Sequence, residues 1–180
     1  MHDRELNRRG FWSLAALAAA ASVAPSLWAQ PRLEKTRVAI AVGGKAAFYN
    51  LPLTIAEQLG YFKAEGLDVE ISDFKGGSLA LQAVVGGTAD VVSGAYEHTI
   101  NLQAKGQQFQ AFVLQGRAPQ ISMGISPRTM PGYKGVADLR GKKIGVSAPG
   151  SSTNMVANRI LLRAGLTASD VSFIGVGTST

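Results

Sequence analysis

Residues 56–71 constrain the fold more than any other stretch of this sequence. Leu59 and Phe62 lie three positions apart, so a helix would turn both toward a hydrophobic core. Two glycines follow, and glycine readily adopts the left-handed conformation that ends helices. Val69 and Ile71 then alternate with polar residues, which is typical of a strand. The stretch therefore predicts a helix that breaks at glycine and leads into a strand.

The rest of the chain continues this alternation of short strands and helices. Such a pattern is typical of a parallel α/β sheet flanked by helices. The expected strands are 37–42, 68–74, 89–93, 110–114 and 171–176, and residues 138–146 are expected to form a helical turn that leads into a further strand. The expected helices are 51–62, 79–85, 96–105 and 153–164, with a short helical turn near 138 and with Asn50, Ser78 and Ser152 as candidate caps.

The first 29 residues have the composition of an export signal. Arg4, Arg8 and Arg9 precede an apolar run at 11–23 that is too short for a comfortable transmembrane helix, and Ala29 offers a cleavage position. The paired arginines followed by an aromatic residue also resemble a twin-arginine signal. We therefore expect residues 1–29 to be removed and the protein to be periplasmic. Residues 30–36 read as a linker.

Composition and missing motifs argue against several classes of protein. The chain has no cysteine and only two histidines, so neither a disulfide nor a zinc site is expected. Its formal net charge of +6 is spread along the sequence without a basic and aromatic face for nucleic acid. We find neither a phosphate-binding P-loop nor a hydrolase nucleophile elbow. We expect a protein that is not an enzyme and carries no cofactor.

Four short loops follow predicted strands and precede predicted helices. Ligands of open parallel sheets bind beyond the carboxyl ends of the strands, where helix N-termini favour anions. Glycine and small hydroxyl residues in these loops would let a ligand approach the backbone. The loops are 43–50, 75–78, 93–98 and 148–153.

Several motifs of the sequence resemble one family. They occur in this order: Gly-Tyr-Phe followed by Glu-Gly-Leu-Asp-Val at 60–69, Gly-Gly-Thr-Ala-Asp-Val at 86–91, Asp-Leu-Arg-Gly-Lys-Lys-Ile-Gly-Val at 138–146 and Gly-Ser-Ser at 150–152. Together they resemble the periplasmic solute-binding proteins of ABC importers for nitrate, sulfonates and taurine, grouped with the thiamine-pyrimidine-synthesis-like proteins.

This resemblance implies a type II periplasmic-binding fold with two α/β lobes. We expect lobe I at 37–120 and a partial lobe II at 121–180, because the second lobe of such a protein needs further chain. The implied function is to bind a small anionic or polar organic solute between the lobes, as a monomer, and to deliver it to a membrane permease and its ATPase. The residues implied to contact the ligand are Phe48, Tyr49, Gly77, Ser78, Gly94, Ala95, Tyr96, Glu97, Ser151, Ser152 and Thr153.

Each of these positions also has a plain structural interpretation. The serines are equally explained as helix caps, and the aromatic residues by packing at a lobe edge. Glu97 and His98 open a helix, where a structural role is favoured. Lys45 and Arg117 are close to predicted strand ends and could pair with an anion, although exposed charges are usually solvated. An enzyme of the same fold and a ligand-sensing input domain remain the alternative functions.

Overall fold

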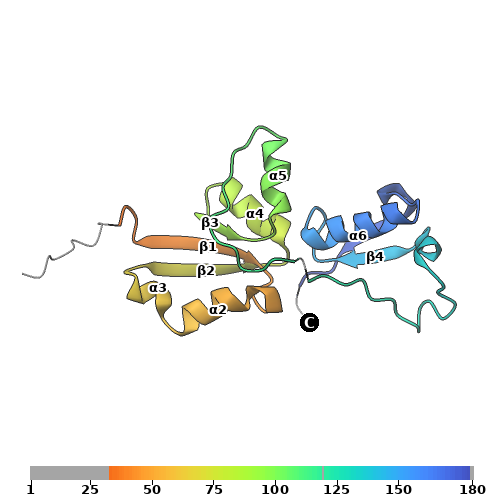
Figure 1. The fold of residues 1–180 in the computed structure, drawn as a ribbon, viewed down its shortest axis with the longest axis horizontal. Coiled ribbons are helices and arrows are strands. Elements are labelled where there is room, and N and C mark those ends of the chain that lie inside the picture. The colour runs from red at the N-terminus through yellow and green to blue at the C-terminus, as the bar shows by residue number, and fades with distance from the viewer. Residues whose placement is uncertain (1–32, 119, 179–180) are drawn as a thin grey trace, which may run out of the picture. The chain divides into compact units, whose positions relative to one another are not determined.

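The computed structural model describes residues 33–118 and 120–178, and residues from Lys35 onward belong to one unit. The export signal expected at 1–29 and residues 30–32 of the expected linker lie outside the described residues. Figure 1 shows helices and strands alternating along the described chain.

The first sheet has three parallel strands in the order β2-β1-β3. They are β1 (Arg37–Gly43), β2 (Asp68–Phe74) and β3 (Val91–Ser93), and Ile40 of β1 lies opposite both Ile71 and Val91. The central strand β1 ends in four consecutive buried residues. A parallel strand covered on both faces requires such an apolar run.

Between β1 and β2 the chain forms three short helices. They are η1 (Phe48–Asn50), α2 (Leu51–Gln58) and α3 (Tyr61–Ala64). The helix expected at 51–62 is therefore interrupted, because Gly60 takes the left-handed conformation with φ of 72°. The helices α4 (Gly77–Val85) and α5 (Glu97–Gln103) follow β2 and β3.

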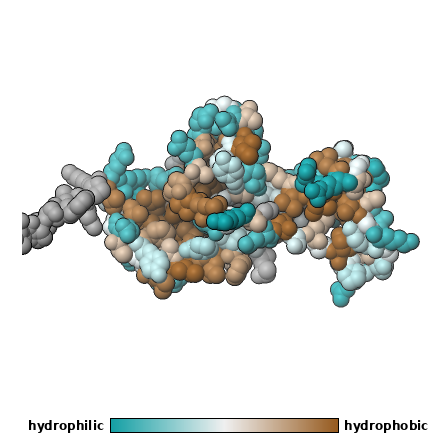
Figure 2. Space-filling view, in the orientation of Figure 1, coloured by the Kyte–Doolittle hydropathy of each residue, from teal (hydrophilic) through white to brown (hydrophobic). Residues whose placement is uncertain are grey.

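The first core is formed by the sheet and α2. Ile40, Val42 and Leu53 are its buried members, and Phe62 packs against them. Leu51, Ile55 and Leu59, spaced at four-residue intervals, remain at least 41% exposed on α2. Figure 2 shows hydrophobic surface in the region of the view where Figure 1 places α2. The helix thus buries one narrow face and leaves an apolar stripe on another.

The second sheet pairs β4 (Lys143–Val146) with β5 (Ser172–Gly175), again in parallel. It is preceded by η2 (Val136–Leu139), and α6 (Ser152–Arg163) and η3 (Ala168–Asp170) connect its strands. A separate core joins them, with buried residues Leu139, Ile144, Val146, Ala157, Leu161 and Leu166. The two sheets therefore have a hydrophobic core each, and the boundaries of the expected lobes stay a prediction.

Two sequence-based expectations are wrong. Residues 110–114 form no strand, and Phe112, Val113 and Leu114 are 65–75% exposed. An apolar run becomes a strand only where a sheet edge pairs with its backbone, and the first sheet as described ends at β3.

The proposed serine caps also differ from the structure. The residues that flank α4 and α6 as N-caps are Gly76 and Ser151, so Ser78 and Ser152 lie inside the first turns. Asn50 is the N-cap of α2, but its side chain makes no capping hydrogen bond. The side chains of Ser78 and Asn50 instead form hydrogen bonds with residues distant in the chain, Ser78 with Pro149 and Ser151 and Asn50 with Ser93.

The predicted fold class is confirmed: the chain is α/β, with parallel sheets flanked by helices. Within residues 33–118 and 120–178, we find no helix with the length and hydrophobicity needed to cross a membrane.

Candidate functional site

The loops after β1 and β2 approach each other so closely that only glycine fits between them. A Cβ atom on Gly43 would lie 2.4 Å from the backbone nitrogen of Gly77, the first residue of α4. No side chain could be accommodated at this separation. The carboxyl end of the central strand therefore meets the N-terminus of α4 directly.

A buried amide ties the loop after β1 to the end of β3. Asn50 is 2% exposed; its Nδ2 donates to the carbonyl of Gly44 at 2.9 Å, and its Oδ1 accepts from Ser93 Oγ at 3.2 Å. Gln115 Nε2 also donates to Ser93 Oγ, at 3.1 Å. Sequence reasoning missed this role, because a candidate helix cap gives no sign of a partner 43 residues away.

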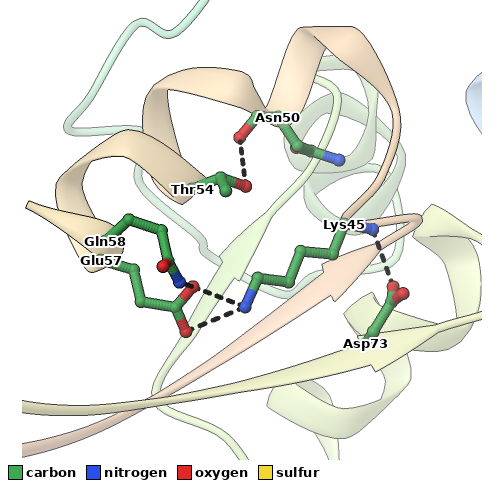
Figure 3. A network of polar contacts seen from close by, with 6 residues as sticks. All are labelled: Lys45, Asn50, Thr54, Glu57, Gln58 and Asp73. Carbon is green, nitrogen blue, oxygen red and sulfur yellow. Dashed lines mark hydrogen bonds and ion pairs between the residues drawn. The ribbon is translucent and has the colours of Figure 1, made fainter.

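Two charged groups near the same loop already have partners (Figure 3). The N–H groups of Gly44 and Lys45 both donate to Asp73 Oδ1 at 2.9 Å. Lys45 Nζ lies 2.6 Å from Glu57 Oε2, and this hydrogen-bonded partner lowers the pKa of the Glu57 carboxyl. Lys45, considered from the sequence as an anion partner, is thus committed to an ion pair with α2.

The N-termini of α4 and α6 are joined by hydroxyl groups. Ser151 is fully buried, and its Oγ accepts a hydrogen bond from the backbone N–H of Ser78 at 3.1 Å. The two serine hydroxyls lie 3.0 Å apart, and Ser78 Oγ donates to the carbonyl of Pro149 at 3.0 Å. The structure thus brings together two loops, 75–78 and 148–153, that the sequence suggested as separate parts of one site.

Within the second of these loops, side chains from the first turn of α6 hold the backbone. Thr153 Oγ1 accepts from the N–H of Ser147 at 2.9 Å and lies 2.8 Å from Ser147 Oγ. Asn154 Oδ1 accepts from the N–H of Gly150 at 3.0 Å. Thr153, a candidate ligand contact, therefore supports the loop, whereas Ser152 makes no side-chain hydrogen bond to cap α6.

His98 lies next to Gly77, the first residue of α4. The residue is 4% exposed and its Nε2 atom has no hydrogen-bond partner. A Cβ atom on Gly77 would be 3.1 Å from that nitrogen. Burial lowers the pKa of His98, and the opposing effect of Glu97 is smaller, so the imidazole is neutral at pH 7. The structure places an unpaired polar atom at the point where α4 begins.

Aromatic side chains occupy the loops on either side of this point. Phe48 is 77%, Tyr96 67% and Tyr49 40% exposed, and the Tyr49 hydroxyl donates to the carbonyl of Gly43 at 3.2 Å. Burial and, secondarily, the Asp73 carboxylate raise the pKa of Tyr49, so its hydroxyl keeps its proton. Gly94, Ala95 and Glu97, also predicted to contact a ligand, flank Tyr96 between β3 and α5.

A hollow of about 310 Å³ opens beside η1, β4 and α6. Five hydroxyl-bearing residues, Tyr49, Ser122, Ser147, Thr153 and Thr178, line it. Its remaining lining is apolar or glycine: Ala47, Ile121, Met123, Ile144, Gly145, Val146, Val156, Ala157, Ile160, Val176 and Gly177.

Thr178 was not predicted as a site residue, yet it lies against the loop after β1. A Cβ atom on Gly44 would lie 2.5 Å from Thr178 Oγ1. The position of Thr178, directly after a strand, was the available sequence signal. Among residues 33–118 and 120–178, no group of three or more acidic or histidine side chains could hold a metal ion.

Comparison with known proteins identifies the family of the chain. Residues 47–180 match the family model described as NMT1/THI5 like. The chain belongs to the NMT1/THI5-like family. A protein of Brucella abortus (strain 2308), provisionally named a binding protein, is 32% identical over 149 residues, which cover 79% of this chain and 43% of the relative.

Two solved structures share the fold. A protein from Bordetella bronchiseptica RB50 has 69% sequence identity and a TM-score of 0.82 over 83% of this chain and 47% of that protein. The alkanesulfonate-binding protein SsuA from Xanthomonas axonopodis pv. citri, bound to MOPS, has 21% identity and a TM-score of 0.55, covering 81% of this chain and 49% of its own. The chain thus spans about half the length of the proteins it matches, and it shares its fold with these two proteins.

Proposed function

We propose that this chain is part of an extracytoplasmic solute-binding protein of an ABC importer. Its ligand is a small anionic or polar organic solute such as a sulfonate, taurine or nitrate. A membrane permease with its ATPase receives the solute. The export signal expected at 1–29 agrees with a periplasmic location, and the family relatives that carry a functional name are named binding proteins.

The observation that carries this proposal is the meeting of two helix N-termini at Ser78 and Ser151. Both α4 and α6 have at least nine residues, so each concentrates partial positive charge at its start. The buried Ser151 hydroxyl already serves as an oxygen acceptor for the N–H of Ser78. A ligand oxygen that reaches this point would take the place of Ser151 Oγ as acceptor for the Ser78 N–H, at the start of two helices whose dipoles favour an anion.

Reversible binding explains the surrounding residues better than catalysis does. His98 is buried and neutral, Lys45 is paired with Glu57, and the hydroxyl groups bond to one another or to backbone. Neither serine has a histidine within hydrogen-bonding distance to activate it. These groups can bind and orient an anion without transforming it.

Ligand binding to the full-length protein tests the proposal. We expect at least one of methanesulfonate, taurine and nitrate to raise the melting temperature in a concentration-dependent way, because a ligand that binds only the folded state stabilises it. Ser78→Ala and Ser151→Ala should weaken the binding measured by calorimetry by roughly 5- to 10-fold, the loss expected for one hydrogen bond to a charged group.

The matched control is Ser126→Ala, since Ser126 is exposed and its side chain is not part of the site. It should bind as the wild type does. Absence of a thermal shift and of binding heat with all three anions would contradict the proposed ligand class.

A further inference from the structure

Three of the five exposed aromatic side chains in the described part of the chain belong to two neighbouring loops at one edge of the first sheet. Phe48, Tyr49 and Tyr96 lie there, whereas Tyr61 begins α3 and Phe112 lies outside the sheet. β1 and β3 are adjacent and parallel, so the loops after their carboxyl ends are neighbours. Large apolar side chains gathered at a candidate site indicate a surface for binding.

The backbone beneath these aromatic residues is held firmly. Phe48 and Tyr49 directly precede Asn50, and Tyr96 comes three residues after Ser93. The buried hydrogen bond between Asn50 and Ser93 joins the two loops at 3.2 Å. The backbone that carries the aromatic side chains is therefore held in place, and ligand contact requires little further ordering of these two loops.

One buried polar atom near the same loops has no hydrogen-bond partner. His98 Nε2 is buried and unbonded beside Gly77, and His98 follows Tyr96 by two residues. The N-terminus of α4 is thus accompanied by an unpaired imidazole nitrogen, and leaving a buried polar atom unpaired costs free energy. A polar ligand group that enters beside α4, or a small shift that it induces, would relieve this cost.

We infer that the natural ligand is an aromatic organic anion. Its acidic group lies at the start of α4 near His98 and Ser78, and its ring contacts Phe48 and Tyr96. This inference rests on the proposed function and narrows the ligand class. Planar rings suit such a surface because aromatic pairs are attracted through their faces and edges in addition to the area they bury. The hydroxyls and apolar side chains of the adjoining hollow leave room for substituents.

Calorimetry with the full-length protein and three sulfonates separates the ring from the acidic group. The probes are benzenesulfonate, cyclohexanesulfonate and methanesulfonate, which share one head group. We expect benzenesulfonate to bind at least roughly 10-fold more tightly than methanesulfonate and several-fold more tightly than cyclohexanesulfonate, since a planar ring adds stacking to burial. Benzoate tests whether a carboxylate can replace the sulfonate.

Two site variants and one control locate the effect. Phe48→Ala and Tyr96→Ala should each weaken benzenesulfonate binding by roughly 3- to 10-fold and leave methanesulfonate binding unchanged. Tyr61→Ala removes an aromatic residue of similar exposure, 55%, outside the two loops and should change neither. Circular dichroism melts identify any variant that has lost its fold.

The results distinguish this inference from the function on which it rests. Equal affinity for methanesulfonate and benzenesulfonate, or aromatic binding unaffected by both site variants, overturns the aromatic ligand and leaves anion binding intact. Failure of every sulfonate and of benzoate to bind overturns both. Loss of methanesulfonate binding in Phe48→Ala or Tyr96→Ala, with the fold retained, also overturns the assigned division between ring and acidic group.

Discussion

The loops after β1 and β4 occupy equivalent places in two β-α-β segments, yet different chemistry holds them. Two N–H groups of the first loop donate to Asp73, which lies on the neighbouring strand β2, and its carbonyl at Gly44 accepts from Asn50. In the second loop, the N–H groups of Ser147 and Gly150 donate to Thr153 and Asn154 in the first turn of α6.

This difference indicates which contacts determine the conformation of each loop. Within the second loop, these bonds come from residues four to six positions along the chain, so this part of its conformation forms together with its helix. The first loop is held by Asn50 from within, and also by Asp73 of β2 and Ser93 of β3, so it depends on the assembled sheet. The first sheet also carries the aromatic and histidine side chains. We expect ligand specificity to depend on the first segment, and the following changes test the contrast from the largest effect to the smallest.

A substitution in the core of the second segment should lower stability more than any other change described here. Leu161 is fully buried, and Leu161→Ala should lower the free energy of unfolding by about 2–5 kcal/mol because it removes apolar contacts and leaves a cavity. The neighbouring Leu162 is 59% exposed, so Leu162→Ala should cost at most about 0.5 kcal/mol. Urea unfolding measures both. Similar losses for the two variants would contradict the separate core described for this segment.

Disrupting the contact between Gly43 and Gly77 should have the second-largest effect on stability. Gly43→Ala places a methyl group where a backbone atom lies 2.4 Å away, and we expect it to lower the free energy of unfolding by about 1–3 kcal/mol and to reduce ligand affinity. Gly124→Ala is the control, since a Cβ there has nothing within 4 Å. Urea unfolding and calorimetry report the two effects. Unchanged stability in Gly43→Ala would mean that the two loops do not approach each other as described.

Removing the buried amide should weaken the first loop in particular. Asn50→Ala leaves the Gly44 carbonyl and Ser93 hydroxyl without this partner, and the expected loss is about 1–3 kcal/mol in urea unfolding. Asn101 on α5 is exposed and contacts only a methionine sulfur, so Asn101→Ala should be nearly neutral. Faster hydrogen exchange of the Gly44 to Asn50 amides, without a change at residues 147–153, would sharpen the contrast between the loops.

The smallest expected effect is a pH dependence from His98. Burial holds its pKa in the folded protein below the ordinary value of 6.5, so the unfolded chain takes up a proton first as the pH falls. Stability from this residue is therefore complete well above pH 6.5 and is lost as the pH falls through that value. Melting temperatures from pH 8 to pH 5 should fall less steeply in His98→Gln than in the wild type. Parallel curves would show that His98 is not buried as a neutral group.

The order of strands and helices could be read largely from the sequence. Alternating apolar residues predicted the strand at 68–74, a turn leading into a strand was expected within 138–146, and the glycines near residues 60 and 66 marked real breaks. Such signals are local, because hydrophobic periodicity and glycine conformation need no distant partner. The stretch at 110–114 was wrongly predicted as a strand for the same reason: its pattern is local, whereas pairing requires an edge.

The candidate site was predictable only in outline. Helix starts after strands indicated which loops would matter, but Ser78 was not recognised as the hydrogen-bonding partner of Ser151, 73 residues away. Lys45 was considered as an anion partner, although its charge is paired with Glu57. Thr178 was missed, since nothing in a short strand end reveals that it packs against Gly44. The roles of the predicted ligand contacts stay predictions.

By itself, the sequence determined the α/β class and the loops that gather at strand ends, because backbone preference and hydrophobic period act over a few residues. The tertiary structure alone decided that Asn50 bridges to Ser93, that His98 is buried without a partner for Nε2, and that Ser151 meets Ser78. The first and third depend on hydrogen bonds between residues distant in the chain, and the second on how His98 packs beside Gly77. Hydrogen bonds act over about 3 Å, so only the packed sheet determines which donors and acceptors meet.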